Sequence, residues 1–463
     1  MAKAKIATVF FCQKCGYESS KWMGQCPGCR EWNTFVEEQV VTGQGKSSRM
    51  KTVTGFSEKN KPAKLSEVSI EKEDRISTGI GELDRVLGGG IVAGSLTLVG
   101  GDPGIGKSTL LLQVCRNLAG DGREVLYVSG EESLKQIKLR ANRIGTFSDH
   151  LKLLCETDLE SIEETIRRSK PEVVIIDSIQ TMFHGEISAA PGSISQVREA
   201  TGLFLQLAKG LGVSIFIVGH VTKEGTVAGP RVLEHMVDTV LYFENAESGM
   251  RMLRAAKSRF GSVDEIGLFE MTEKGLLCVK DASRYFLSAR SDGDLPSGIA
   301  FTPVIEGSRT FVVEVQALAV PARSGYQRIY SDKVDMGRVN RIAAILERHA
   351  GLDLSQDDIY VNVAGGMKLK EGSVDLALAL ALYSSKTDTP LPSTLASFGE
   401  LSLAGEVRPV TFSSRRVKTL SDMGFSKIIV SQGTENEGSA DTIKTKDIRS
   451  AVIAAFKGAK KSK

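Results

Sequence analysis

The chain has 463 residues, of which 41% are hydrophobic and 25% are charged, and its formal net charge is +3. This length exceeds what one hydrophobic core usually supports, so we expect two or three domains. The net charge is too small to indicate nucleic-acid binding by bulk electrostatics, so any basic patch has to be local. No apolar run reaches the roughly 18 residues of a membrane-spanning helix, and the start lacks a signal-peptide pattern. We expect a cytoplasmic protein without a membrane partner.

Four of the seven cysteines lie in the segment CQKCGYESSKWMGQCPGC, as two C-x-x-C pairs. Each pair forms a tight turn whose thiolates point at one centre, and two pairs close a tetrahedral site suited to Zn²⁺. Two disulfides, a redox pair or iron in a rubredoxin-like site are the alternatives, and a reducing compartment disfavours the disulfides. The sequence therefore predicts a structural zinc ribbon over residues 1–36, with the ligands Cys12, Cys15, Cys26 and Cys29. The other cysteines, Cys115, Cys155 and Cys278, stand in apolar contexts and are expected to pack in cores.

Residues 37–64 are polar and predict a linker. From residue 65 to residue 284, β-branched runs alternate with helical patterns, as in an α/β domain with a parallel sheet and crossover helices. The predicted strands cover residues 95–101, 124–130, 172–177, 213–220, 239–244 and 251–257. A second α/β pattern occupies residues 285–463.

The segment GGDPGIGKST follows the first of these strands and precedes a helical pattern, which is the context of a P-loop. Backbone N–H groups at the start of the helix converge on the β-phosphate of ATP. Lys107 supplies a positive charge to the β- and γ-phosphates, and Ser108 offers its hydroxyl to Mg²⁺. The predicted nucleotide-binding residues are Gly101, Asp102, Pro103, Gly104, Ile105, Gly106, Lys107, Ser108 and Thr109.

Two further strands end in acidic residues. VVIID ends in Asp177, which we expect to hold the hydration shell of Mg²⁺. In LYVSGEES, the strand is followed by Glu131 and Glu132, and we choose Glu131 as the carboxylate that polarises the attacking water. The alternative is that both glutamates only cap the next helix. The pattern predicts an NTPase and leaves its purpose open.

The segment TGIGELDRVLGGGIVAGSLTLVGGDPGIGKST resembles the RecA-like ATPases. With CQKC…CPGC, GHVTKEG and KSRFG added, the whole chain is similar to the RadA (Sms) family of bacterial DNA-repair proteins. The resemblance implies a RecA-like core, hexameric rings with ATP turnover between subunits, and branch migration in recombinational repair. The implied partners are single-stranded DNA, branched recombination intermediates and the RecA recombinase. The alternative is a P-loop ATPase that regulates a protein partner and does not act on DNA.

The resemblance also assigns roles to single residues. It places Lys107, Ser108 and Asp177 in the nucleotide site, makes Glu131 the water-activating acid and makes His220 the sensor of the γ-phosphate. Without the resemblance, His220 would be interpreted as a histidine at a strand end whose hydrogen bonds are satisfied. The glycine-rich segment after His220, which carries Lys223 and Arg231, suits a loop that contacts DNA.

The family's Lys-Asn-Arg-Phe-Gly signature reads Lys257-Ser258-Arg259-Phe260-Gly261 in this chain, so a serine replaces the asparagine. Lys257 and Arg259 stand two residues apart on a predicted strand and therefore on one face. Both could reach the γ-phosphate of a neighbouring subunit as an arginine finger does, and are assigned catalytic roles. A solvated strand face is the alternative.

Residues 285–463 resemble the proteolytic domain of Lon. Lys370-Glu371-Gly372 match its nucleophile segment, but Ser373 stands where Lon has proline and Val374 where Lon has the catalytic serine. Arg416 stands where Lon has its lysine, and an arginine cannot act as a general base. We expect a proteolytically inactive domain in which Ser373 is a helix N-cap. Its candidate DNA-contacting cations are Lys368, Lys370, Arg415, Arg416 and Lys418.

Overall fold

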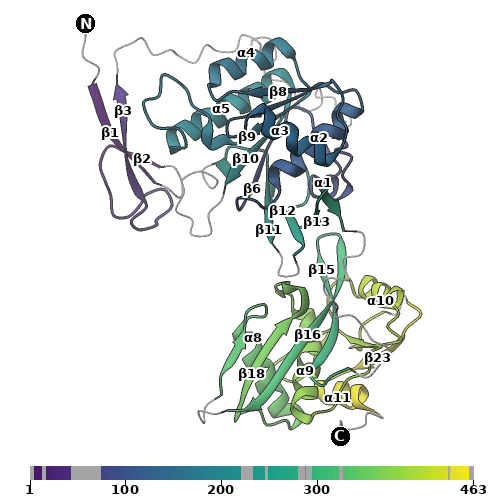
Figure 1. Cartoon of the computed structure of the whole chain (residues 1–463). Helices are drawn as coiled ribbons and strands as arrows, with labels where there is room; N and C mark the ends of the chain where they lie inside the picture. The colour runs from purple at the N-terminus through teal and green to yellow at the C-terminus, as the bar shows by residue number, and fades with distance from the viewer. Residues whose placement is uncertain are drawn as a thin grey trace, which may run out of the picture. The chain divides into compact units, whose positions relative to one another are not determined.

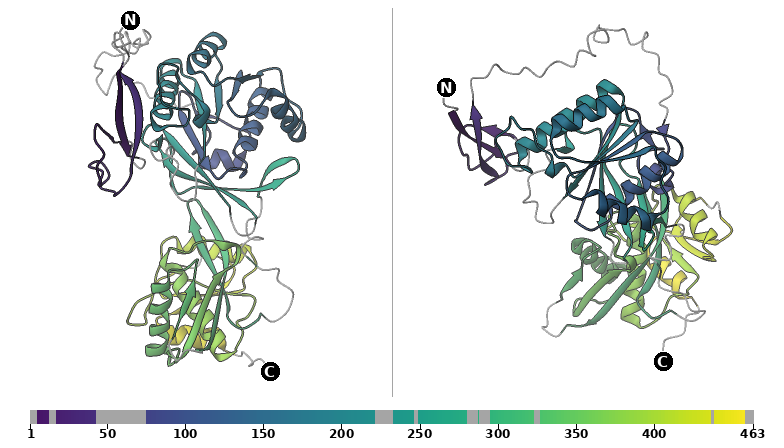
Figure 2. Two further views of the ribbon diagram at one scale, coloured as in Figure 1. Left: turned by 60° about the vertical axis from the view of Figure 1, so that its left-hand side comes forward. Right: turned by 45° about the horizontal axis from the view of Figure 1, so that its top comes forward.

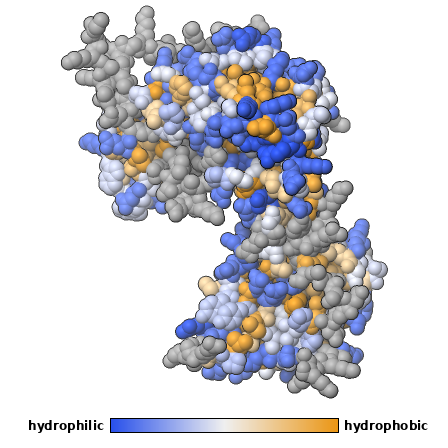
Figure 3. All heavy atoms as spheres, viewed as in Figure 1, coloured by the Kyte–Doolittle hydropathy of each residue, from blue (hydrophilic) through white to orange (hydrophobic). Residues whose placement is uncertain are grey.

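The computed structural model describes residues 5–12, 17–42, 75–220, 233–245, 249–279, 287, 295–322, 327–435 and 438–457. The chain divides into two compact units (Figure 1). The first unit contains residues 1–245 and 251–278, and the second contains residues 246–250 and 279–463. Hydrophilic residues are interspersed with apolar ones on the face of both units in Figure 3. Among the described residues, no helix is long and apolar enough to cross a membrane.

The N-terminal ribbon is a three-stranded antiparallel sheet in the order β2-β1-β3. Its strands are β1 (Lys5–Cys12), β2 (Glu18–Ser19) and β3 (Phe35–Thr42). The pairing of β3 with β1 runs from Phe35 opposite Cys12 to Thr42 opposite Lys5. The ribbon thus continues beyond residue 36, its predicted end, because the backbone of β3 completes the ladder with β1.

A nine-stranded sheet in the order β14-β13-β12-β11-β6-β10-β9-β7-β8 forms the centre of the first unit. The strands from β11 to β8 are paired in parallel, and β12, β13 and β14 extend the sheet in antiparallel fashion. The parallel strands are β6 (Leu96–Gly101), β7 (Val125–Ser129), β8 (Leu151–Cys155), β9 (Val173–Asp177), β10 (Ser214–His220) and β11 (Thr239–Asn245). The antiparallel ones are β12 (Arg251–Ser258), β13 (Ile266–Thr272) and β14 (Gly275–Cys278). The sequence predicted β6, β7, β9, β10, β11 and β12, and these predictions are confirmed.

Helices lie on both faces of this sheet (Figure 2). They are α1 (Gly81–Val86), α2 (Lys107–Gly120), α3 (Leu134–Ile144), α4 (Leu159–Ser169) and α5 (Ile194–Leu211). Successive side chains of β9 divide between two cores, because side chains alternate along a strand. Val173 and Ile175 pack with α2 and α3, whereas Val174 and Ile176 pack with α4 and α5. β6 lies between β11 and β10, so its carboxyl end, where the segment that leads into α2 begins, lies away from both edge strands of the sheet.

The single cysteines differ in burial. Cys115 is buried in α2, so its predicted core role is confirmed. Cys155 and Cys278 are exposed, and the prediction was wrong for them. They end β8 and β14, which are the two edge strands of the sheet, where one side of the strand has no neighbour.

The second unit is built on a mixed seven-stranded sheet in the order β17-β18-β16-β15-β19-β22-β23. Its strands are β15 (Ile299–Glu306), β16 (Arg309–Pro321), β17 (Ile329–Ser331), β18 (Asp357–Val363), β19 (Leu395–Ser397), β22 (Lys427–Ser431) and β23 (Asp441–Thr445). Its helices are α8 (Met336–Ile345), α9 (Asp375–Thr387), α10 (Ser413–Asp422) and α11 (Ile448–Phe456). Every residue from Leu376 to Leu382 is fully buried, which explains why α9 is apolar on all sides.

Short elements complete the two units. Two small hairpins pair β4 (Arg75–Ile76) with β5 (Ile91–Val92), and β20 (Glu400–Leu401) with β21 (Val407–Arg408). Single helical turns are η2 (Ile179–Thr181), η3 (Leu346–Ala350), η4 (Ala364–Gly366) and η5 (Gly372–Val374).

Candidate nucleotide and metal sites

The P-loop joins β6 to α2 and has the backbone that phosphate binding requires. Gly101 and Gly106 have φ values of 148° and 119°, which favour glycine. A Cβ atom on Gly101 would lie 2.8 Å from the carbonyl oxygen of Phe243, and one on Gly106 would lie 2.8 Å from Cε of Met271. No side chain caps the N-terminus of α2. The positive end of the helix dipole is therefore available to an anion.

Lys107 is the first residue of α2 and is buried. Its Nζ donates hydrogen bonds to the carbonyl oxygens of Gly101 at 2.7 Å and Asp102 at 3.0 Å. Burial lowers the pKa of Lys107, and the charges of Asp177, Asp102 and Glu131 partly oppose that effect. The structure thus brings the predicted P-loop lysine and the two predicted acids into one electrostatic cluster.

Asp177 ends β9 and is held by a residue that the sequence analysis missed. The hydroxyl of Tyr127, on the adjacent strand β7, donates to Oδ2 of Asp177 at 2.5 Å. Burial, reinforced by Asp177, raises the pKa of Tyr127 well above its usual value, so the phenol stays protonated and fixes the carboxylate. The available signal was a tyrosine in an otherwise aliphatic strand, because a buried hydroxyl needs a partner.

Glu131 and Glu132 follow β7 but have different environments. Glu131 is exposed, and Oγ of Ser178, the residue after Asp177, donates to its Oε1. Glu132 forms an ion pair with Arg140 of α3. The N-cap of α3 is Ser133, so the structure does not support the alternative that the two glutamates cap this helix.

The remaining predicted nucleotide ligands line the same loop. Pro103 and Gly104 are exposed, Ser108 and Thr109 are half-buried in the first turn of α2, and Ile105 is buried. His220 ends β10, and its backbone pairs with Gly101; its side chain lies outside the described residues. Residues 221–232, which include Lys223 and Arg231, also lie outside them.

Lys257 and Arg259 converge on one segment, residues 233–238. Nζ of Lys257 donates to the carbonyl oxygens of Glu234, at 2.7 Å, and Val237, at 2.8 Å. Arg259, one residue beyond β12, donates from Nη1 to Oδ1 of Asp238 at 3.1 Å. The two cations therefore lie near each other, although only Lys257 is within β12, and both have partners within their own chain.

Asp238 is almost completely buried and collects three donors. Besides Arg259, it accepts hydrogen bonds from Nζ of Lys209 in α5 at 2.7 Å and from the backbone N–H of Leu96 at 3.0 Å. Leu96 begins β6, the strand that leads into the P-loop. Asp238 thus ties Arg259 to the framework of the nucleotide site, and the sequence analysis did not single it out.

Three cysteines of the ribbon form a cluster. The sulfur atoms of Cys12, Cys26 and Cys29 all lie within 4.8 Å of one another, and those of Cys12 and Cys29 are 3.6 Å apart. Two thiolates bound to one tetrahedral Zn²⁺ at about 2.3 Å would be about 3.8 Å apart, so this spacing fits. It is too long for a disulfide bond between Cys12 and Cys29. Cys15, the fourth predicted ligand, lies outside the described residues.

Comparison with known proteins covers all three parts of the chain. Residues 60–226 match the AAA domain family, residues 10–37 the rubredoxin metal binding domain, and residues 333–434 the subunit ChlI of Mg-chelatase. The chain is 49% identical to the DNA repair protein RadA of Bacillus subtilis over 433 residues, which are 92% of this chain and 93% of the relative. It is 48% identical to the DNA repair proteins RadA of Listeria monocytogenes and Treponema pallidum, over 94% of each chain.

The chain belongs to the RadA family. It is a DNA repair protein with an AAA ATPase domain, an N-terminal cysteine ribbon and a C-terminal α/β domain of the ChlI and Lon-like type. The resemblance and the fold class predicted from the sequence are confirmed. The AAA domain match ends at residue 226, before Lys257 and Arg259.

In the C-terminal domain, Ser373 is not a helix N-cap, and that prediction was wrong. Ser373 lies inside η5, and α9 begins at Asp375 without a side-chain cap. Its Oγ instead accepts a hydrogen bond from Nη1 of Arg416 at 3.1 Å. An N-cap residue precedes the helix in an extended conformation and accepts a hydrogen bond from its first turn, whereas Ser373 lies within a 3-10 turn and the cap position of α9 is Val374.

Arg416 is also not a surface cation, so its predicted contact with DNA is contradicted. Only 1% of it is exposed, and its guanidinium forms an ion pair with Glu371 at 2.5 Å. It also donates to the carbonyl oxygens of Pro303 at 2.6 Å and Thr411 at 3.1 Å. Arg415 is half-buried, whereas Lys368, Lys370 and Lys418 are exposed.

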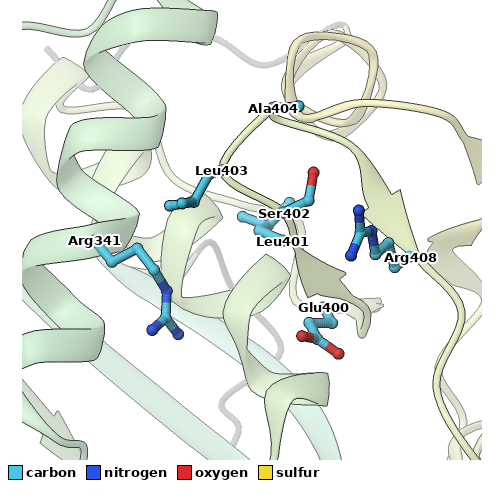
Figure 4. Close-up of a pocket in the computed structure, with 7 residues that line it drawn as sticks. All are labelled: Arg341, Glu400, Leu401, Ser402, Leu403, Ala404 and Arg408. Carbon is cyan, nitrogen blue, oxygen red and sulfur yellow. The ribbon is translucent and has the colours of Figure 1, made fainter.

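A pocket of about 450 Å³ opens near the start of α9 (Figure 4). It is lined by residues 400–404, and Figure 4 shows Arg341 of α8 on one side of this segment and Arg408 of β21 on the other. Ser373, only 2% exposed, is not among its lining residues. In the described part of this domain, the serine thus has no general base beside it, because its basic partner is an arginine, and it does not line this pocket.

We predict that Arg416→Ala destabilises the C-terminal domain by about 3–5 kcal/mol, because the change leaves Glu371 without its partner in the buried cluster. Ser373→Ala removes one hydrogen bond and should cost only about 1 kcal/mol. Chemical unfolding of the full chain measures both, and Arg415→Ala is the matched control. Equal midpoints for Arg416→Ala and Arg415→Ala would contradict the prediction.

Proposed function

We propose that this protein is a DNA-dependent ATPase, a helicase-type motor that promotes branch migration of recombination intermediates on single-stranded DNA. The observation that carries the proposal is the cluster of Lys107, Asp177 and Glu131 at the P-loop of a chain whose relatives are DNA repair proteins. The proposed assembly is a homo-oligomer, a hexameric ring, and the proposed protein partner is the RecA recombinase.

The proposed roles follow from the contacts. The amine of Lys107 moves from the loop carbonyls to the β- and γ-phosphates, while Ser108 and Asp177 hold the magnesium ion that shields phosphate charge. Tyr127 keeps Asp177 in one orientation, and Ser178 does the same for Glu131, which accepts a proton from the attacking water. His220 senses the γ-phosphate.

The C-terminal domain is proposed to be a scaffold for ring assembly and DNA contact, without peptidase activity. Two observations support this proposal: Ser373 is buried and therefore not accessible as a nucleophile, and its partner Arg416 is permanently charged and therefore cannot act as its general base. The proposed domains are a ribbon from residue 1 to the end of β3 at Thr42, a linker over 43–64, an ATPase over 65–284 and this domain over 285–463.

For the ribbon, we propose one structural Zn²⁺ per chain, held by Cys12, Cys15, Cys26 and Cys29. Four thiolates fill the coordination shell, so the ion has no open position for catalysis. We predict that Cys29→Ser or Cys12→Ser releases the zinc, while Cys115→Ser retains it as the matched control. Metal analysis of protein purified under reducing conditions measures this, and stoichiometric iron in place of zinc would contradict the choice of metal.

ATP turnover with and without single-stranded DNA tests the proposed function. We expect DNA to accelerate hydrolysis and its effect to fall steeply as salt rises, because bound lysines and arginines displace counterions from the phosphates. The other candidate, an ATPase that regulates a protein partner, is favoured by the small net charge of +3. Turnover that does not change with DNA at any salt concentration would support it instead.

A further inference from the structure

The C-terminal sheet carries an exposed aromatic surface at its β17-β18-β16 edge. Tyr330, Tyr360 and Leu318 stand side by side on these three strands, with Tyr360 in register with both neighbours. They are 43%, 40% and 52% exposed. The two tyrosine rings are stacked, with centroids 4.7 Å apart and planes 9° from parallel. In the next row, Nδ2 of Asn362 donates to Oε1 of Gln316 at 3.1 Å. We name these five residues the tyrosine face.

The tyrosine face lines a hollow of about 470 Å³ that continues into a second hollow of about 430 Å³. The two share Ser331 and Asp332 in their linings. The second hollow contains three lysines and two aspartates, and its arginine is engaged with backbone carbonyls of residues 370 and 371. The lysines of this hollow are Lys333, Lys368 and Lys370.

Both hollows offer what an unpaired nucleotide strand needs. Flat aromatic side chains on an open sheet stack with bases of any sequence, and lysines beside them neutralise phosphates. Tyr360 lies between Tyr330 and Leu318, whereas Tyr330 is on the edge strand β17, so the ring face of Tyr330 that points away from Tyr360 is the one on which a base extends the existing stack. A contact with another protein would favour a larger apolar centre, whereas the one aliphatic side chain of this face, Leu318, is bordered by the amides of Gln316 and Asn362.

We propose that the tyrosine face binds bases of single-stranded DNA by stacking, with the sugar–phosphate backbone directed toward Lys333, Lys368 and Lys370. This inference rests on the proposed function, in which the chain acts on single-stranded DNA, and adds a base-contacting site to it. The site recognises unpaired strands in general, because every base has a flat face.

The test measures binding of the full chain to a labelled oligo-dT and to an abasic oligonucleotide of the same length. We expect Tyr330→Ala/Tyr360→Ala to weaken oligo-dT binding about 10-fold to 100-fold and to leave abasic binding unchanged, because only stacking is lost. Tyr330→Phe/Tyr360→Phe keeps both rings and should bind like the unmodified chain. Lys368→Ala/Lys370→Ala should weaken both oligonucleotides and reduce the salt slope by about one per lysine.

Controls separate the outcomes. Leu403→Ala removes an exposed side chain elsewhere in the same unit and should change neither affinity. DNA-free ATP turnover and the unfolding midpoint report folding, and Tyr330→Leu on the edge strand replaces the double variant if that variant unfolds. If the unmodified chain does not bind oligo-dT at all, the proposed function itself is wrong.

Three results would overturn the inference while leaving the proposed function in place. The unmodified chain could bind abasic and oligo-dT strands equally tightly, or the alanine variant could bind oligo-dT like the unmodified chain. The alanine variant could also change oligomeric state in light scattering, with DNA affinity falling only in proportion to the loss of assembly. That last result would assign the tyrosine face to a contact between copies of the chain.

Discussion

Glu131→Gln should reduce ATP turnover by about 10²–10⁴-fold, the usual contribution of a positioned general base. The amide keeps the size of the side chain and can still bond to Ser178, but it cannot accept a proton from water. ATP binding should stay close to normal, because the phosphates contact the P-loop and Lys107. Single-turnover hydrolysis, together with binding of a fluorescent ATP analogue, separates the two effects.

Glu132→Gln is the matched control, since it makes the same chemical change one residue away. Glu132 pairs with Arg140 and does not contact Ser178 in the described contacts, so its loss should cost only modest stability and leave the chemical step intact. The assignment is wrong if the two variants hydrolyse ATP equally well, or if Glu132→Gln is the slower enzyme.

The sequence predicted much of the ATPase sheet because its central strands are uniformly buried. The apolar runs in β6, β9 and β10 are recognisable from the sequence alone, because both faces of each of these strands are covered and most of their residues are apolar. The edge strand β8, with the sequence LKLLC, is only half-buried, and its mixed pattern does not stand out. The ribbon strand β3 was cut short because its polar end is stabilised by pairing with β1, which a local pattern does not reveal.

The candidate site was predictable where a role depends on neighbours in sequence, and was missed where it depends on neighbours in space. The P-loop glycines, Lys107 and Asp177 belong to local motifs, whereas Tyr127 reaches Asp177 from another strand. Arg416 is a second residue whose environment depends on neighbours in space. A basic residue in a polar helix is usually solvated, and only the tertiary contacts with Glu371 and Ser373 show that it is buried.

The contacts of Arg259 bear on how it could act on a neighbouring subunit. Its side chain is 56% exposed, and the contact with Asp238 uses Nη1. A guanidinium has five N–H donors in a fixed fork, so one edge can remain on Asp238 while others reach a phosphate. Because Asp238 also holds Lys209 and the start of β6, we propose that it positions Arg259 for this role.

Arg259→Ala should reduce ATP turnover by about 10³–10⁵-fold with nearly normal ATP binding, because the finger stabilises charge that develops only in the transition state. Lys209→Ala is the matched control: it also removes an ion pair with Asp238, so a purely structural role predicts equal losses in the two variants.

If Arg259 acts across subunits, mixing Arg259→Ala with inactive Lys107→Ala should restore turnover. In a random equal mixture, about a quarter of head-to-tail interfaces combine an intact P-loop with an intact finger. Mixtures that assemble together yet stay as inactive as either variant alone would show that Arg259 acts on the nucleotide of its own subunit. In that case every chain in the mixture lacks either Lys107 or Arg259, so no nucleotide site is complete.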